Sequence, residues 1–578
     1  MRRREYLRSA VGAAGLTGIA GSALTAAGSD DDTDASPSAE TTTPTPTAEP
    51  ATTAPSGTTA GAETDGDDGF APLAQMDVTN DQAGFQTTEA VMEPSGRYAF
   101  ASRLDGFYVV DCDDPENPEV VGSYSEIESP DGRTMESFND LKYNRGRLML
   151  ATDRGSDFSG IALFDVRDPL SPKALKTYQT GYSIHNADLH GEYAYLSEGT
   201  EVEIVHVAPD QPESVATWSV VDYDDAYEDV SSQLRNLHDL YVQDGRAYLA
   251  YWDSGSWILD VSDPANPSYL GHVADYSAEE LADLDQRKAI EYALEPEGND
   301  HYVQPNDDGS LLAVGGESWD LEVDSLETDE PEEEDLGGPS GIVLWDVSDP
   351  SNPEELSEIE APEPPEGETS RRQGGYYTTS HNFEIAGDYL YSSWYRGGVK
   401  VHDISDPESP EQLAHWEDGY QASFWTAQVG VPGEFFVGTS YLHPTEQDGP
   451  GGFYTFPDPS DSDATVTPSG EPVDLSTPES TATPTETATE TPTPSATESP
   501  TATTEATQTA TATPESTEMA TDTATSSGAD TGSGAETDSG TDTDASGGSG
   551  PGLGVLSGLA GLGLGAWRLT GSADENEE

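Results

Sequence analysis

A short run of apolar residues that ends in an aspartate and a proline-framed turn occurs five times along the chain. It reads GFYVVDCDDPENP at 106–118, GIALFDVRDPLSP at 160–172, GSWILDVSDPANP at 255–267, GIVLWDVSDPSNP at 341–353 and GVKVHDISDPESP at 398–410. Self-similarity at a spacing of about 40 to 55 residues is typical of one supersecondary unit stacked many times. Because a single unit cannot bury its apolar face alone, the pattern predicts a repeat fold.

The polar and apolar positions around each phrase predict four strands per unit. In the third unit, 187–190 and 193–197 flank a tight Gly191-Glu192 turn, 201–207 alternates between apolar and polar residues, and 214–218 follows a proline turn. The sixth unit has the same order of elements. Four antiparallel strands with hairpin connections form one blade of a β-propeller.

Seven units of this kind fit between residues 70 and 457. They begin near Glu89, Asn139, His185, His238, His301, His381 and Thr426. The last unit supplies only three strands, and 72–78 (PLAQMDV) matches the pattern of a fourth strand. We therefore predict an all-β, seven-bladed β-propeller that an N-terminal strand closes, which removes the open sheet edges.

The aspartate that ends each apolar run is expected to hold the turn that follows it. Its carboxylate accepts from backbone amides two residues on, and the proline presets φ for the turn. A residue repeated in every unit serves the unit, so a structural role is favoured over catalysis. These turn residues are Asp111, Asp165, Asp260, Asp346 and Asp403. Cys112 is expected to be a turn residue. Because it is the only cysteine, a disulfide framework is excluded.

Two insertions interrupt the repeat. Residues 277–293 have helical spacing, and Ser277 with Glu280 forms a capping box, so we predict a helix there. Residues 318–340 contain an acidic run from Glu327 to Asp335 and predict a solvated loop. A low-affinity calcium loop is the alternative, although no EF-hand spacing is present.

The flanking segments have compositions that cannot form a packed core. Residues 28–69 predict a disordered acidic linker, and 458–549 predict a disordered stalk rich in Thr, Ser, Pro and Glu.

The formal net charge is -88, from 111 acidic and 23 basic residues, which excludes nucleic acid as a partner. Concentrated salt would screen such self-repulsion, so the composition favours a halophile's protein, with specific cation binding as the alternative.

Both ends of the chain contain export features. Residues 1–27 predict a signal peptide, and Arg3-Arg4-Glu5-Tyr6-Leu7-Arg8 resembles the twin-arginine motif, with a basic membrane anchor as the alternative. Residues 550–569 form a short apolar segment that begins with Pro-Gly, followed by an acidic tail at 570–578. This segment resembles the C-terminal sorting signal that archaeosortases process, although Leu553 and the acidic tail depart from it. We therefore expect an exported protein attached to the cell surface, with cleavage or retention of the span left open.

The repeated phrases resemble the LVIVD repeat, which is named for its apolar strand ending in Asp. The resemblance covers most of 85–416 and is specific at the VDxSDPxxP turn. It implies a propeller similar to those of cell-surface proteins, most of which have no assigned chemistry.

The candidate chemistry comes from the repeat itself, since the chain has no G-x-S-x-G elbow, P-loop, dinucleotide fingerprint or H-E-x-x-H motif. Four histidines occupy corresponding places before the innermost strand of four consecutive blades: His185, His238, His301 and His381. Around a propeller axis these imidazoles would approach one another and could hold a transition metal. Glu89 and Asn139 have the same place in the first two blades, and Glu89 could orient a metal ligand.

The alternative is that each histidine hydrogen-bonds to a neighbouring turn and is purely structural. Our leading hypothesis is therefore an exported, surface-anchored propeller that acts as a non-catalytic binding module. Its loop face would bind a protein, glycan or small ligand, and its C-terminal segment would contact the membrane. The second hypothesis is a metal-dependent enzyme, most similar to an oxidoreductase, that uses the axial histidines. The sequence identifies no ligand, substrate or metal.

Overall fold

The computed structural model describes residues 47–48, 69–77, 87–441 with gaps at 154–155, 209, 320–337 and 373–374, and 452–460. The predicted signal peptide, most of the acidic linker, nearly all of the stalk, the C-terminal apolar segment and the acidic run at 327–335 lie outside the described residues. In the part that is described, no helix is both long and apolar enough to cross a bilayer.

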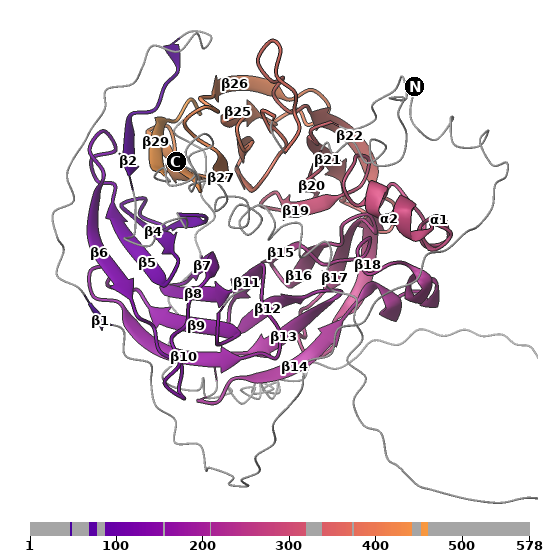
Figure 1. The fold of residues 1–578 in the computed structure, drawn as a ribbon, viewed down its shortest axis with the longest axis horizontal. Coiled ribbons are helices and arrows are strands. Elements are labelled where there is room, and N and C mark those ends of the chain that lie inside the picture. The colour runs from indigo at the N-terminus through magenta and orange to yellow at the C-terminus, as the bar shows by residue number, and fades with distance from the viewer. Residues whose placement is uncertain are drawn as a thin grey trace, which may run out of the picture. The chain divides into compact units, whose positions relative to one another are not determined.

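Seven antiparallel sheets surround a central axis, which confirms the predicted all-β seven-bladed propeller (Figure 1). Blade 1 contains β3 (Ala90–Met92), β4 (Tyr98–Arg103), β5 (Gly106–Asp111) and β6 (Glu119–Ser125). Blade 2 contains β7 (Phe138–Asn144), β8 (Arg147–Thr152), β9 (Gly160–Asp165) and β10 (Lys173–Gln179). Blade 3 contains β11 (Ala187–His190), β12 (Tyr193–Glu198), β13 (Glu201–His206) and β14 (Glu213–Trp218).

The remaining blades follow the same order from the axis outwards. Blade 4 contains β15 (Asp239–Gln243), β16 (Arg246–Ala250), β17 (Ser256–Asp260) and β18 (Ser268–Val273). Blade 5 contains β19 (Asp300–Pro305), β20 (Leu311–Gly316), β21 (Ile342–Asp346) and β22 (Glu354–Ile359). Blade 6 contains β23 (Phe383–Ala386), β24 (Tyr389–Ser393), β25 (Val399–Asp403) and β26 (Glu411–Trp416). Blade 7 contains β27 (Phe424–Val431), β28 (Phe435–Ser440), β29 (Gly452–Pro457) and β2 (Ala74–Asp77).

The N-terminal strand closes the ring as predicted. β2 pairs antiparallel with β29, with Ala74 opposite Thr455, and the Leu73 amide donates to the Thr455 carbonyl at 2.7 Å. Phe70 stacks on Phe436 and Phe456, with ring centroids 6.4 and 6.1 Å apart. A further two-residue strand, β1 (Thr47–Ala48), pairs with β6 at the outer edge of blade 1.

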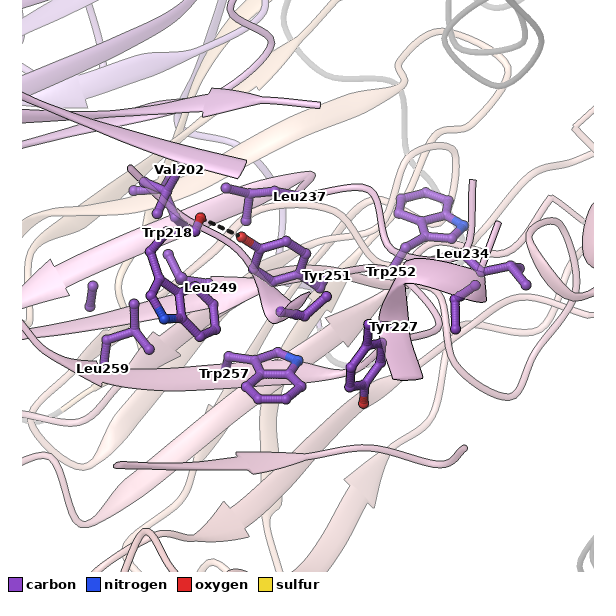
Figure 2. Packing of buried hydrophobic residues seen from close by; sticks show 14 of the residues in the cluster. Val202, Trp218, Tyr227, Leu234, Leu237, Leu249, Tyr251, Trp252, Trp257 and Leu259 are labelled. Carbon is purple, nitrogen blue, oxygen red and sulfur yellow. Dashed lines mark hydrogen bonds between the residues drawn. The ribbon is translucent and has the colours of Figure 1, made fainter. Parts of the chain in front are cut away.

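The apolar core of the described residues consists of seven clusters, one between each pair of adjacent blades. In β5, Phe107 and Val109 pack toward blade 2, while Tyr108 and Val110 pack toward blade 7. Because both faces of the strand are buried, its sequence is a continuous apolar run and does not alternate. Figure 2 shows the largest interface, between blades 3 and 4, where the Tyr251 hydroxyl donates to the Trp218 carbonyl at 3.3 Å.

The aspartates of the repeated phrase each accept a backbone amide two residues on, over 2.8 to 3.1 Å. These aspartates are Asp111, Asp165, Asp260, Asp346 and Asp403. The expectation for Cys112 was wrong. It follows Asp111 directly, as Val166 follows Asp165, and both side chains are buried between blades. Burial also raises the pKa of the Cys112 thiol to about 12, so this residue is part of the core.

A β-bulge recurs between the third and fourth strands of the first six blades. The fourth strand has one extra residue there, and that residue is aliphatic in each blade. The extra residues are Val121, Leu175, Val215, Leu270, Leu356 and Leu413. Such a bulge bends the outer strand and increases its twist.

The predicted helix at 277–293 is two helices, α1 (Ala278–Ala282) and α2 (Gln286–Tyr292). The capping box of Ser277 and Glu280 is present at the start of α1. The single-helix prediction was wrong because the Asp285 side chain accepts from the amides of Arg287 and Lys288, which starts a second helix. Two short 3-10 helices that the sequence did not predict, η4 (Val220–Asp222) and η5 (Asp225–Asp229), precede blade 4.

Side chains on the innermost strands hydrogen-bond to the backbone of the next blade. The bonds join Asp140 Oδ2 to the Ala187 amide at 2.8 Å, Asp188 Oδ2 to Val242 at 2.7 Å, Gln304 Oε1 to Ile385 at 3.2 Å, Glu384 Oε2 to Val429 at 2.7 Å and Gln428 Oε1 to Met92 at 3.3 Å. These bonds connect adjacent blades around the axis. They also give several carboxylates of the innermost strands a hydrogen-bond donor.

Deletion of residues 70–80 tests closure of the ring. We expect the free energy of unfolding to fall by about 2 kcal/mol or more, because Phe70, Leu73 and Met76 lose apolar burial and β29 becomes a sheet edge. Thermal melting of the full chain in concentrated salt measures the change, with a deletion of 470–545 as the control. An unchanged melting temperature in the first variant would contradict the role of β2.

Glu384 gives a prediction for pH dependence. Burial raises its pKa from 4.5 to about 7, although the bond from the Val429 amide opposes this. The native state therefore retains a proton that the unfolded chain releases, and this contribution to stability is lost as pH rises from about 4.5 through 7. This loss amounts to about 3 kcal/mol in the free energy of unfolding. We expect it to be absent in Glu384→Gln, which keeps an acceptor for the Val429 amide but cannot ionise.

Urea unfolding of both proteins at about pH 5 and about pH 8 measures the difference. Glu434→Gln, in the exposed turn between β27 and β28, is the matched control. Equal pH dependence in Glu384→Gln and the unsubstituted protein would count against the assignment.

Candidate metal centre at the axis

The innermost strands bring the four predicted histidines into one row. His185 precedes β11, His238 precedes β15, His301 lies within β19 and His381 precedes β23. The ring centroids of consecutive histidines are 4.7, 4.3 and 4.5 Å apart, so the four imidazoles form an unbroken arc across blades 3 to 6. The repeat therefore placed four side chains from distant parts of the sequence in contact.

Neighbouring polar groups fix the orientation of three of these histidines. His185 Nδ1 lies 3.0 Å from Asp153 Oδ2, and His381 Nδ1 lies 2.6 Å from the Trp425 carbonyl oxygen. Asn186 Nδ2 lies 3.5 Å from His238 Nδ1 and also donates to the His238 backbone carbonyl at 2.9 Å. A hydrogen bond at one ring nitrogen determines which nitrogen is available to a metal.

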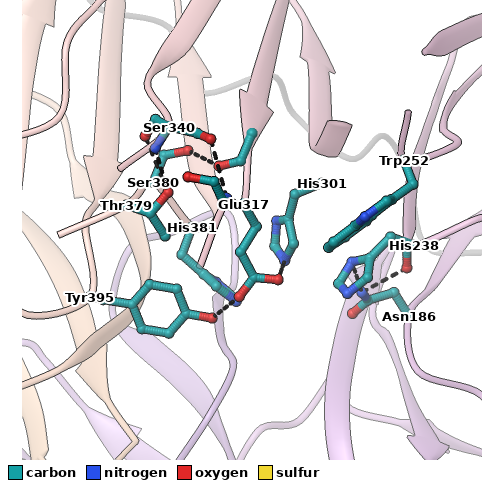
Figure 3. A network of polar contacts seen from close by, with 12 residues as sticks. Asn186, His238, Trp252, His301, Glu317, Ser340, Thr379, Ser380, His381 and Tyr395 are labelled. Carbon is teal, nitrogen blue, oxygen red and sulfur yellow. Dashed lines mark hydrogen bonds and ion pairs between the residues drawn. The ribbon is translucent and has the colours of Figure 1, made fainter. Parts of the chain in front are cut away.

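Glu317, which directly follows β20, joins the histidine arc (Figure 3). Its side chain is buried, and its Oε2 lies 3.8 Å from His301 Nε2. Its Oε1 accepts from the Tyr395 hydroxyl at 2.6 Å and from Arg372 Nη1 at 3.3 Å. The carboxylate is thus held in place by two donors while its second oxygen faces the histidines.

One ligand atom from each of His238, His301 and Glu317 lies within 4.8 Å of the other two. In a tetrahedral site, two atoms that each lie about 2.1 Å from the ion are about 3.4 Å apart. The three groups would therefore have to approach one another by up to about 1.4 Å to reach coordination distance. Among the described residues, His238, His301 and Glu317 form one compact group of potential metal ligands.

Aromatic rings surround the histidine arc. The Trp252 ring lies 5.0 Å from His238, and Trp425 lies 4.1 Å from His381, between ring centroids. The Arg372 guanidinium lies 3.8 Å from the centroid of the Trp319 ring. His238, His301 and His381 are buried, and the low local dielectric strengthens the electrostatic interactions among the polar groups there.

Burial keeps two of the imidazoles neutral. It lowers the pKa of His301 to about 4. The Glu317 carboxylate acts in the opposite direction and raises this pKa, whereas the charges of His185 and Arg372 lower it further. Burial also lowers the pKa of His381 well below its usual range, with His301 the next cause. His301 Nδ1 is buried and has no hydrogen-bond partner among the described residues.

The other two predicted site residues lie elsewhere on the axis. Glu89 Oε2 accepts from Asn382 Nδ2 at 3.0 Å, and its carboxylate interacts with the charges of Lys142 and Asp140. The Asn139 carbonyl accepts from the Thr88 hydroxyl at 2.8 Å. Glu317 was not predicted, and the only signal for it was an acidic residue at the end of the strand that pairs with β19.

Comparisons with known proteins match one blade by sequence. A family model described as the LVIVD repeat matches residues 235–275, which contain blade 4, His238 and Asp260. No curated protein matches the chain. Among solved structures, the β-propeller domain of Cps50 (Swd1) from Myceliophteria thermophila is 9% identical, with a TM-score of 0.43. That match covers 66% of this chain and 99% of the other.

Proposed function

We propose that this chain is an exported, surface-attached propeller whose function depends on a transition metal at the axis. The observation that supports this proposal is the convergence of His238, His301 and Glu317, whose ligand atoms lie within 4.8 Å of one another. The residues come from two blades that are adjacent around the axis, so the folded ring is required to assemble them.

The donor set defines the class of metal. Two imidazoles and one carboxylate are the protein ligands of several catalytic zinc sites and of non-haem iron(II) oxygenases. Both metals leave coordination positions open for water or substrate, and His185 and His381 flank the proposed ligands. The metal would act as a Lewis acid or a redox centre, while Tyr395 and Arg372 orient the Glu317 carboxylate.

A non-catalytic binding module remains the second candidate. The bond between His381 Nδ1 and the Trp425 carbonyl is the kind of contact that a structural histidine makes. In that case the arc and its aromatic neighbours would stabilise the loop face on which a protein, glycan or small ligand binds. The two candidates differ in whether the histidines hold a metal.

Metal content and stability of three variants distinguish the candidates. We expect the natively purified full chain to contain about one equivalent of Zn or Fe, and His238→Ala and Glu317→Gln to lower metal affinity at least roughly tenfold. His272→Ala is the matched control, because His272 stacks on Trp257 in the outer part of blade 4. Elemental mass spectrometry and thermal melting on the same samples give both readouts.

A metal-free native protein would contradict the metal proposal. If the histidines are structural, His238→Ala should lower the free energy of unfolding by about 1–3 kcal/mol, because it leaves hydrogen-bond partners unsatisfied. No metal would be lost, since none was bound.

The location is tested separately at the N-terminus. The Arg3-Arg4 pair and the C-terminal apolar segment support export and surface attachment. In a host with a twin-arginine pathway, we expect Arg3→Lys with Arg4→Lys to keep the chain in the cytoplasm, whereas the unsubstituted chain is digested by protease added to intact cells. Equal protease protection of both chains would contradict export by this route.

A further inference from the structure

A second contact between a carboxylate and an imidazole borders the compact group of His238, His301 and Glu317. Asp153 directly follows β8 in blade 2, in the place that Glu317 has after β20 in blade 5. Asp153 Oδ2 lies 3.0 Å from His185 Nδ1, and the ring centroids of His185 and His238 are 4.7 Å apart. His185 of blade 3 is therefore in contact with side chains from both neighbouring blades.

The two carboxylate–imidazole contacts differ in their exposure to solvent. The side chains of Glu317 and His301 are 5% and 2% exposed, whereas those of Asp153 and His185 are 22% and 26% exposed. His185 is also the one histidine of the arc that is not buried. A molecule that reaches the arc from solvent would therefore arrive beside Asp153 and His185.

The contact with Asp153 determines which ring nitrogen of His185 carries the hydrogen. A carboxylate oxygen only accepts hydrogen bonds, so His185 Nδ1 donates to Asp153 Oδ2. In the neutral ring, Nε2 then has the lone pair and acts as an acceptor. The Asp153 amide donates to the Ser137 carbonyl at 2.8 Å, which holds the backbone of the carboxylate in place. The pair is thus a fixed acceptor at the open end of the arc.

His185 lies beside the proposed metal ligands and outside their group. The ligand atoms of His238, His301 and Glu317 are within 4.8 Å of one another, and His185 contacts this group through the ring of His238. A zinc or iron ion with three protein ligands keeps a coordination position open. An acceptor next to that position forms a hydrogen bond with the bound molecule only if this molecule carries a hydrogen donor.

We propose that Asp153 is a positioning residue that holds His185 Nε2 as a hydrogen-bond acceptor beside the open position of the metal. The centre then favours substrates whose metal-binding group carries an O–H or N–H, such as water, an alcohol or a hydroxamic acid. An anion without hydrogen gains nothing from His185. This inference rests on the proposed function and names the class of its substrate.

Binding of two small anions to the metal-loaded full chain tests the role of Asp153. The chain is reconstituted with Co²⁺, whose visible spectrum reports a bound ligand. It is titrated with acetohydroxamate, which keeps an N–H donor, and with azide, which has no hydrogen. Both probes are anions, so a change of charge at Asp153 affects them alike. We expect Asp153→Asn to weaken acetohydroxamate relative to azide by roughly three- to tenfold, because the new amide can also donate to Nδ1 and favour the other tautomer.

Three further variants complete the test. Asp153→Glu keeps a carboxylate and should recover part of the preference, whereas His185→Phe keeps a ring without an acceptor and should lose it. Asp157→Asn is the matched control, because Asp157 is exposed in the same loop after β8. Thermal melting and Co²⁺ content of the same samples show that each variant is folded and loaded.

An unchanged ratio of the two affinities in Asp153→Asn and His185→Phe would overturn the inference and leave a contact that only joins blades 2 and 3. Equal weakening of both probes would overturn it as well. If Asp153→Asn does not fold, the ratio in His185→Phe decides. A native chain that binds no Co²⁺ would instead contradict the metal centre itself, so the two failures are distinguishable.

Discussion

The closed ring is the constraint on which the rest of this structure depends. Seven sheets can bury both of their faces only if every blade has a neighbour on each side, and the pairing of β2 with β29 supplies the last interface. The apolar cores lie between the blades, so no single blade has a core of its own. Closure also brings the innermost strands toward one axis, where many of their side chains are buried. Polar groups there must therefore bond to one another, to the next blade or to a ligand.

The axis separates two kinds of chemistry. The histidine arc places buried, neutral imidazoles beside one carboxylate that Tyr395 and Arg372 hold in place. Elsewhere on the innermost strands, Lys142 forms an ion pair with Asp140 at 2.6 Å. The bonds from Asp140, Asp188 and Glu384 to the next blade each use one carboxylate oxygen to join adjacent blades.

Much of the fold could be predicted from the sequence because its causes are local and repeated. The apolar run, the Asp turn and the proline recur with each unit, and the correspondence of the four histidines followed from the same register. Glu317 could not be predicted, because its position depends on how β20 ends beside β19 and belongs to no repeat. The break between α1 and α2 depends on the competing cap at Asp285, and the burial of Cys112 depends on the alignment of single residues. The recurrent bulge could not be predicted, because the extra residue is aliphatic and does not differ in type from the other residues of the strand.

The central claim is that closure of the ring creates a metal centre from His238, His301 and Glu317. X-ray absorption at the metal edge of the natively purified full chain tests it most directly. The account predicts a first shell of nitrogen and oxygen only, with the multiple scattering of two or more imidazoles at the distances of protein-bound Zn or Fe. A spectrum without imidazole scattering, or a purified protein that contains no metal, would contradict the claim.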